Sequence, residues 1–363
     1  MKKIIFLFFI LTPINFVVFS QTQNAKIDEL LRSYANLNKF SGNVLIAEKG
    51  KVIFEKSYGF ADREFDIPNS KVTKFPIASL TKQFTAVLIL QLAEAGKINL
   101  NAPISRYLPY YKKEIGDQIS IHQLLAHTSG LPEYTERDDF FADISKHSYT
   151  HKEFIQKFCS DSLLSKPGTE YKYANTGYYI LGAIIEEITK SNYAEVLQKN
   201  ILDIVGMKNT GLENDSTIVK EKAKGYHFKS GVYWKAGYID MLATIFSAGA
   251  IYSTTDDLHL WDKALYSDKL LSSKSRELMF TPVLANYGYG LGVTKFLVSD
   301  LKKEMHFVFH QGAINGFRSI MTHIVNENVL IVILCNNFDT DLNPISNGIF
   351  SILHHQAYTT PKE

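Results

Sequence analysis

Segments with the character of β-strands lie near both ends of this chain of 363 residues. Near the start, residues 43–47 and 51–55 are rich in Val, Ile, Leu and Phe and flank a turn at 48–50, a pattern typical of a hairpin. Toward the end, strand patterns cover residues 287–293, 305–310, 317–324 and 329–335, with a hairpin turn at 326–328. Because strands need partners, the sequence predicts one antiparallel sheet built from both ends of the chain.

Helical periodicity dominates between these strands. After Ser79, apolar residues recur at spacings of three and four up to Gly96, which predicts a buried amphipathic helix. Further helices are predicted at 27–37, 178–189 and 345–355. The fold class is therefore a mixed α/β chain of the α+β type, with an antiparallel sheet flanked by helices plus a mainly helical lobe. We expect a sheet lobe from residues 21–98 and 240–360, and a helical lobe from residues 99–239.

The first residues have the pattern of a secretory signal peptide. Lys2 and Lys3 precede an apolar run at 4–11, and the small residues Val18 and Ser20 suit a cleavage site after Ser20. The apolar run is shorter than the ~20 residues that a membrane-spanning helix needs. We therefore expect a signal peptide at 1–20 and a mature protein at 21–363, periplasmic or secreted, with no stable membrane anchor.

The charge balance limits the class of partner. Removal of the leader takes away two lysines and leaves basic and acidic side chains in equal number. A neutral chain is a poor ligand for nucleic acid, and no basic amphipathic helix suggests membrane-surface binding. A small-molecule or peptide substrate is the expected partner, and the oligomeric state stays open.

Cysteine and histidine usage gives no sign of a metal site. Cys159 and Cys335 lie among apolar residues, which favours two buried free thiols over the one disulfide that they could form. The histidines show no His-Glu-x-x-His pair and no zinc-ligand spacing. No metal or cofactor is expected.

Ser79 and Lys82 form the first candidate catalytic pair. Residues three apart on a helix share a face, so the lysine amine lies within reach of the serine hydroxyl. Burial and the positive end of the helix dipole both disfavour an ammonium ion, which lets the lysine act as a base. The same spacing at Ser299 and Lys302 falls in a polar stretch between strands, where a solvated loop is expected.

Tyr173 and Asn175 form the second candidate, in a loop before a helix. A phenol beside a lysine cation ionises or shares its proton, and an amide holds both the lysine and a substrate carbonyl. The same tripeptide sequence occurs at Tyr34–Asn36, but it lies inside an expected helix, where a packed tyrosine is the natural interpretation.

His310, Gln311, Gly312 and Ala313 form the third candidate, at the end of an expected strand. Glycines on an edge strand let a substrate backbone approach closely, and strand N–H groups bind a developing oxyanion. A similar tripeptide, Lys229–Gly231, lies in a polar turn and is a less suitable candidate for this strand motif.

These three elements, in this order, resemble the serine β-lactamase and penicillin-binding protein superfamily, specifically its class C-like branch of β-lactamase-related peptidases and esterases. The resemblance covers nearly the whole mature chain. Supporting segments similar to that branch lie at 124–131, 247–249, 253–258, 289–292 and 312–317.

The resemblance implies a β-lactamase/transpeptidase-like fold and a serine hydrolase that works through an acyl-enzyme. It implies Ser79 as nucleophile, Lys82 as its proton partner and Tyr173 as base and leaving-group acid. Asn175 would orient Lys82 and the substrate amide. The N–H groups of Ser79 and Ala313 would form the oxyanion hole, and His310, Gly312 and Ala313 would line the substrate site.

One departure from the branch concerns the substrate. His310 stands where the branch's lactamases carry lysine, and a histidine is mostly neutral at pH 7. We therefore expect activity on D-amino-acid peptides or small esters to exceed that on β-lactams. His127 is interpreted as the structural histidine of a tight turn.

Two other classes remain for comparison. An α/β-hydrolase needs a Gly-x-Ser-x-Gly elbow, and this chain has none. A non-catalytic module that binds or senses cell-wall peptides would be favoured by loss of Ser79, Lys82 or Tyr173, and all three are present.

Overall fold

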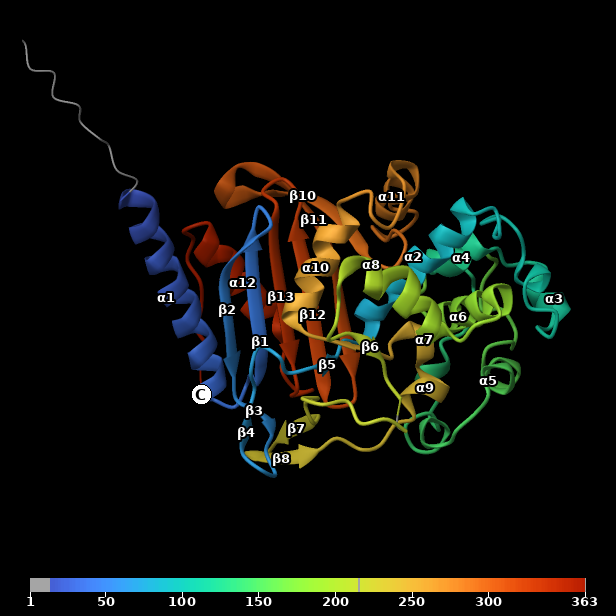
Figure 1. The fold of residues 1–363 in the computed structure, drawn as a ribbon, viewed down its shortest axis with the longest axis horizontal. Helices are drawn as coiled ribbons and strands as arrows, with labels where there is room; N and C mark the ends of the chain where they lie inside the picture. Colours follow the sequence, from blue (N-terminus) through green and yellow to red (C-terminus); the bar gives the residue numbers. More distant parts are fainter. Residues whose placement is uncertain (1–13, 215, 363) are drawn as a thin grey trace, which may run out of the picture.

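A six-stranded antiparallel sheet built from both ends of the chain organises the molecule (Figure 1). The computed structural model describes residues 14–214 and 216–362. The strand order is β10-β11-β12-β13-β1-β2, and Leu45 of β1 lies opposite Val332 of β13. The strands are β1 (Gly42–Glu48), β2 (Lys51–Tyr58), β10 (Gly292–Val298), β11 (Lys303–Ile314), β12 (Phe317–Ile324) and β13 (Val329–Cys335). The predicted two-ended sheet is confirmed.

One predicted strand was misplaced. The segment 287–293 was expected to be a strand, but β10 runs from Gly292 to Val298. The segment before β10 is apolar because it packs within the protein: Tyr287 and Tyr289 are both buried. The residues of β10, in contrast, are mostly exposed or half-buried, so burial gives them little strand pattern.

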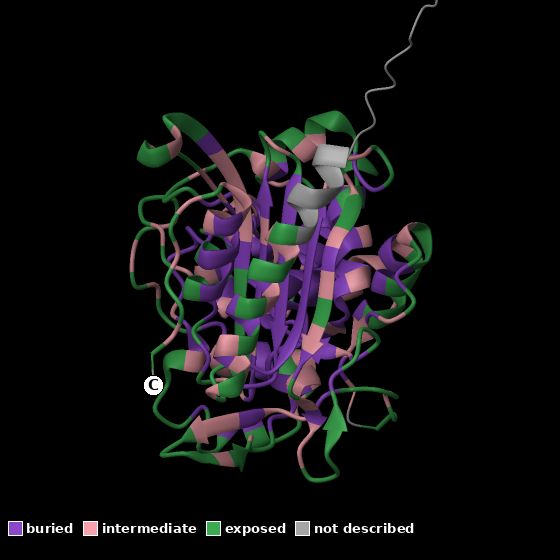
Figure 2. Cartoon of the chain, turned by 90° about the vertical axis from the view of Figure 1, so that its left-hand side faces the viewer, coloured by how far each residue is buried: buried purple, intermediate pink, exposed green. Residues whose placement is uncertain are grey.

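Alternation of side chains along the strands builds two cores. Val44 and Ile46 belong to a cluster with residues of α1 (Ile14–Asn36) and α12 (Leu342–Leu353). Leu45, which points to the opposite face, belongs to the larger cluster shared with the helical lobe. Figure 2 shows the buried strands behind the outward, partly exposed face of α1. Two-sided burial therefore fixes the register of the sheet.

The remaining elements make up the helical lobe, its connections to the sheet, and one helix, α10, that packs on the sheet against β1 and β13. The helices are α2 (Thr81–Glu94), α3 (Lys113–Gly116), α4 (Ile121–Leu125), α5 (His151–Phe158), α6 (Asn175–Thr189), α7 (Tyr193–Leu197), α8 (Asp203–Val205), α9 (Met241–Thr244), α10 (Thr255–Leu265) and α11 (Ser273–Phe280). Short strands are β3 (Phe60–Asp62), β4 (Ile67–Pro68), β5 (Phe75–Pro76), β6 (Gly211–Leu212), β7 (Tyr226–Lys229), β8 (Val232–Lys235) and β9 (Ile251–Ser253). The β7–β8 hairpin lies within the segment that we expected to be mainly helical.

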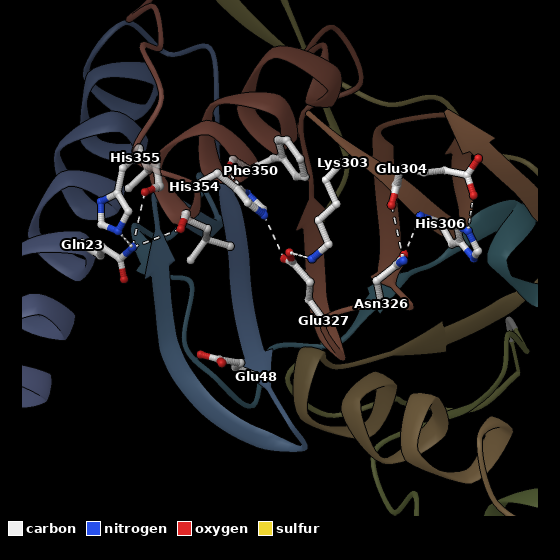
Figure 3. A network of polar contacts seen from close by, with 12 residues as sticks. Gln23, Glu48, Lys303, Glu304, His306, Asn326, Glu327, Phe350, His354 and His355 are labelled. Atoms are coloured by element: carbon white, nitrogen blue, oxygen red, sulfur yellow. Dashed lines mark hydrogen bonds and ion pairs between the residues drawn. The ribbon is translucent and has the colours of Figure 1, made fainter. Parts of the chain in front are cut away.

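Polar contacts join α12 to a turn of the sheet and α1 to the end of α12 (Figure 3). Glu327, in the turn between β12 and β13, accepts hydrogen bonds from Lys303 at 2.9 Å and pairs with His354 at 2.8 Å. Gln23 of α1 donates to the carbonyl of Leu353 at 3.2 Å. Burial alone would raise the pKa of Glu327, but Lys303 and His354 outweigh it and lower that pKa. These contacts hold α1 and α12 on one face of the sheet.

Residues 1–13 of the expected leader lie outside the described residues. Among the described helices, none combines the length and apolar character needed to cross a bilayer. Cys159 and Cys335 are free and buried, as predicted.

β11 and the turn before α2 approach each other at Gly312. A Cβ atom at Gly312 would lie 2.4 Å from the carbonyl oxygen of Ile77, well inside contact distance. Ser319, opposite Gly312 in β12, donates to the same carbonyl at 2.7 Å. Glycine is therefore required where the sheet edge meets the turn that carries Ser79.

This contact predicts that Gly312→Ala destabilises the protein. Because the new methyl group meets backbone, the sheet edge or the turn must shift, at a cost of about 1–3 kcal/mol. Urea denaturation of the variant measures this cost. The control is Gly237→Ala, where a Cβ would meet only the Asn315 side chain, at 3.6 Å, and no loss is expected. Equal stability of the two variants would contradict the close approach.

Candidate functional site

Ser79 sits in a 3-10 turn, η1 (Ala78–Leu80), immediately before α2. We expected it inside the start of the helix, but α2 begins at Thr81. Ala78 has a φ of +48°, a left-handed conformation that costs a residue with a Cβ atom energy. Leu80 is fully buried on the other side of the turn. This tight, anchored turn presents Ser79 to a cleft of about 740 Å³.

Lys82 is fully buried beside Ser79. Its Nζ lies 3.1 Å from the Ser79 hydroxyl, 2.7 Å from Asn175 Oδ1 and 2.7 Å from the Ala248 carbonyl oxygen. Burial lowers the pKa of Lys82 to about 7, and the charge of Glu133 opposes that shift. A large fraction of the lysine is therefore a neutral amine near neutral pH.

The geometry around Nζ suits a neutral amine that acts as a base. Such an amine has two N–H donors and one lone pair. Asn175 Oδ1 and the Ala248 carbonyl accept only, so they take the two N–H groups. The lone pair is then left for the third neighbour, the hydroxyl of Ser79.

Tyr173 and Asn175 reach the site from the beginning of α6, whose first residue is Asn175. The Tyr173 ring centroid lies 4.9 Å from Lys82 Nζ. Burial raises the pKa of Tyr173, and a hydrogen bond with Ser79 only partly opposes this. Tyr173 is therefore a neutral phenol, able to donate a proton.

His127 braces the segment that carries Tyr173. It occupies a turn with a φ of +56°, as the sequence indicated. Its carbonyl accepts from Lys172 N at 2.9 Å, and its Nδ1 accepts from Ala174 N at 3.1 Å. Its ring packs 4.3 Å from that of Tyr173. Burial holds the pKa of His127 well below its usual range, so the ring is neutral and structural.

His310 lies on the free edge of β11, where the strand faces the cleft. β10 pairs with β11 only as far as Phe309, so residues 310–314 have β12 on one side only. The His310 Nδ1 donates to the Gln311 carbonyl at 2.6 Å, and its Nε2 accepts from the Tyr287 hydroxyl at 2.9 Å. Burial, followed by the charge of Lys82, lowers the pKa of His310 to about 3. His310 is thus uncharged across the physiological range.

All three sequence motifs line the same cleft. Its walls include Ser79, Tyr173, Asn175, His310, Gly312 and Ala313. The three similar motifs lie elsewhere: Ser299 is in the exposed turn η7 (Ser299–Leu301), Tyr34 is in α1, and Lys229 ends β7 at a hairpin turn.

Three contributors to the site were missed from the sequence. Ala248 acts through its carbonyl, which no side-chain pattern reveals, although its segment was noted as similar to the family. Tyr287 lies in the misplaced strand and donates to His310. Glu133 is a buried carboxylate bonded to Asn175, and a lone acidic residue after a proline gave no signal.

Metal coordination finds no support in the described ranges, 14–214 and 216–362. No group of three or more His, Cys, Asp or Glu residues within them is arranged to hold an ion.

Comparison with known proteins identifies the family. The beta-lactamase family profile matches residues 27–350. The chain is 30% identical to the putative penicillin-binding protein PbpX of Bacillus subtilis (strain 168), over 92% of this chain and 79% of that protein. The structure resembles that of a penicillin-binding protein from Bacillus halodurans, with a TM-score of 0.75, 26% identity and coverage of 91% of this chain and 97% of that one.

A further solved structure shares the fold. The D-amino acid amidase from Ochrobactrum anthropi SV3, complexed with L-phenylalanine, superposes with a TM-score of 0.78 at 24% identity, covering 92% of this chain and 99% of that one. Together with the family match across most of the sequence, these likenesses agree with the fold described above. The chain therefore belongs to the beta-lactamase family of serine hydrolases.

Proposed function

We propose that this protein transfers the acyl group of a small amide or ester substrate first to Ser79 and then to water. The observation that carries the proposal is the fully buried Lys82 amine, 3.1 Å from the Ser79 hydroxyl and held by two carbonyl acceptors. A serine hydroxyl becomes a nucleophile only when a base removes its proton, and an amine with a pKa of about 7 performs that role at neutral pH.

In the acylation step, the Ser79 proton passes to Lys82 while Oγ bonds to the substrate carbonyl carbon. The N–H groups of Ser79 and Ala313, which both line the cleft, stabilise the oxyanion. When the intermediate collapses, the bond to the leaving group breaks, and Tyr173 donates the proton that the leaving group requires. Lys82 then returns its extra proton to Tyr173, so both groups are neutral again.

In the deacylation step, water attacks the acyl carbon and gives a proton to Lys82. The ester bond to Ser79 breaks, and Oγ recovers its proton from Lys82. The pKa directions favour Lys82 over Tyr173 as the base, because burial lowers the lysine pKa and raises the tyrosine pKa. Tyr173, which we first expected to be both base and acid, keeps the role of acid.

For the substrate, we propose D-amino-acid peptides or small esters ahead of β-lactams. His310 is neutral, so it supplies no positive charge to a substrate carboxylate. The likeness of fold to the D-amino acid amidase supports an amide substrate. The cleft volume of about 740 Å³ is in the range of small-molecule sites.

We also propose that the protein is exported to the periplasm or secreted, on the basis of the leader pattern at 1–20. Intact-mass measurement of the protein from a host with a secretory pathway tests this. We expect a polypeptide that begins at Gln21, and retention of Met1 or Lys2 in the product would contradict the proposal.

Covalent labelling tests the nucleophile. We expect a fluorophosphonate to add to wild-type protein at Ser79, because Lys82 and the oxyanion site activate this hydroxyl, and Ser79→Ala should abolish the adduct. The measurement is peptide mapping of the labelled protein by mass spectrometry.

The matched control is Ser299→Ala, which removes a serine with the same spacing to a lysine from an exposed turn. Its labelling should equal that of wild type. An adduct that survives in Ser79→Ala would contradict the nucleophile assignment.

Labelling by a fluorescent penicillin as well would place β-lactams among the substrates. No labelling by either reagent would favour the alternative, a non-catalytic module that binds or senses cell-wall peptides.

The rate of Ser79 acylation should depend on pH through Lys82. Below a pH of about 7 the amine is protonated and accepts no proton, so the rate falls about tenfold per pH unit; above it the rate reaches a plateau. Stopped-flow labelling across pH 5 to 9 measures this profile. The part of the profile in which the rate falls toward low pH is its acid limb. His310 is already neutral throughout that range, so His310→Gln should not move the acid limb. A profile that is flat from pH 5 to 9 would exclude Lys82 as the base.

A further inference from the structure

We propose that Glu133 is a positioning residue of this site, which fixes the Asn175 amide with its oxygen toward Lys82. The inference rests on the proposed function, because it assigns to Glu133 the task of presenting Lys82 to Ser79. Glu133 lies in the loop between α4 and α5 and is not among the residues that line the cleft. It therefore acts through Asn175 and not on the substrate.

The contacts of Glu133 are all with donors. Asn175 Nδ2 donates to its Oε1 at 3.1 Å, and the Asn175 backbone N–H donates to its Oε2. The Thr135 backbone N–H and hydroxyl donate to Oε1 at 2.9 Å and 2.6 Å. Glu133 is only 7% exposed. Four converging donors thus satisfy the carboxylate oxygens of Glu133 in this buried position.

Glu133 also replaces a missing helix cap. The N-cap position of α6 is Ala174, which has no side chain able to bond the first N–H groups. Glu133 takes over this role from another part of the chain, and its negative charge lies at the positive end of the helix dipole. Thr176 adds a hydrogen bond to the Pro132 carbonyl at 2.6 Å. The loop and the start of α6 are thereby joined into one unit.

This anchoring decides which end of the Asn175 amide faces Lys82. As placed, the amide nitrogen faces the carboxylate and the oxygen faces Lys82 Nζ, at 2.7 Å. A flipped amide would direct its oxygen at the carboxylate of Glu133 and its N–H groups at the N–H groups of Lys82. Both contacts would become repulsive. Removal of the Glu133 carboxylate abolishes one of these two repulsive contacts, so the observed orientation of the Asn175 amide is less strongly preferred.

The carboxylate also sets the electrostatic balance at Lys82. Burial lowers the pKa of Lys82, and Glu133 is the charged group that opposes it. The other titratable or polar groups around this amine are neutral at pH 7: Ser79 from η1, His127 from its turn, Tyr173 from the segment before α6, Tyr178 from α6 and His310 from β11. Loss of the Glu133 charge should therefore lower the pKa of Lys82 further.

The test is the pH dependence, in Glu133→Gln, of Ser79 phosphonylation by a fluorophosphonate, in which Oγ bonds to phosphorus and fluoride leaves. We expect the acid limb to move to lower pH by about one unit, because an uncharged neighbour no longer favours the ammonium form. We expect the plateau rate to fall by about tenfold to a hundredfold, because the Asn175 amide is no longer held in one orientation. An acid limb at the wild-type pH, whatever the plateau, would overturn the proposal and leave Glu133 a structural residue.

The control is Glu136→Gln, three residues further along the same loop. It removes an equal charge from an exposed side chain that pairs with Lys172 at 3.4 Å. Its acid limb should coincide with that of wild type. A limb that moves as far as in Glu133→Gln would mean that general surface charge sets the pH dependence, and the proposal would fail.

A second variant keeps the test decisive if Glu133→Gln does not fold. Asn175→Asp alone should lose acylation, because two carboxylates then face each other. Adding Glu133→Gln should restore part of the plateau rate, since one carboxylate and one amide again form the pair with exchanged positions. This plateau should be reached at higher pH than in wild type, because the new carboxylate beside Lys82 favours its ammonium form. No recovery in a folded double variant, checked by circular dichroism, would overturn the proposal. Absence of acylation in wild type would instead contradict the proposed function itself.

Discussion

Burial of the Lys82 amine is the interaction on which the rest of the site depends. A lysine in water is a cation and no base at neutral pH. Enclosed between α2, α6 and the Ala248 carbonyl, the amine loses solvation and becomes available as a proton acceptor. The two carbonyl acceptors orient it, and Glu133 prevents burial from lowering its proton affinity further. In the proposed mechanism, activation of Ser79 is therefore a consequence of packing, and His310 supplies no cation to the cleft.

The fold serves this arrangement by bringing distant segments to one edge of the sheet. Ser79 lies on a turn that packs against β12 through the Ser319 hydroxyl. Tyr173 and Asn175 arrive from the helical lobe, where His127 and Glu133 hold the segment from two sides. β11 supplies the third wall because its final residues extend beyond β10. Pairing of β1 with β13 joins both ends of the chain behind these walls.

Much of this architecture could be predicted from the sequence. The bounds of β12 and β13 match the predictions, because both strands are short apolar runs separated by a clear turn. Ser79 and Lys82 were predicted to interact from helical spacing, and their contact holds even though Ser79 precedes α2. The order of the three motifs was sufficient to locate the cleft. Similar short sequences elsewhere could be set aside because they lie in turns or in an outer helix.

The parts that escaped prediction depend on contacts between segments. β10 was misplaced because its residues are largely exposed while the buried aromatic residues before it imitate a strand. The role of Ala248 rests on a backbone carbonyl, and that of Glu133 on a hydrogen bond to a helix start far along the chain. Sequence patterns report the burial of a side chain, but not which distant group it meets.

A direct titration of Lys82 tests the central claim most closely. Carbon-13 labelling at the lysine Cε atoms, with Lys82→Arg to assign the signal, would follow this amine by nuclear magnetic resonance. The account predicts an inflection at a pH of about 7 for Lys82, while exposed lysines titrate near ~10.4. A Lys82 signal that titrates together with the exposed lysines would contradict it, since the amine would then be a cation at neutral pH and could not activate Ser79.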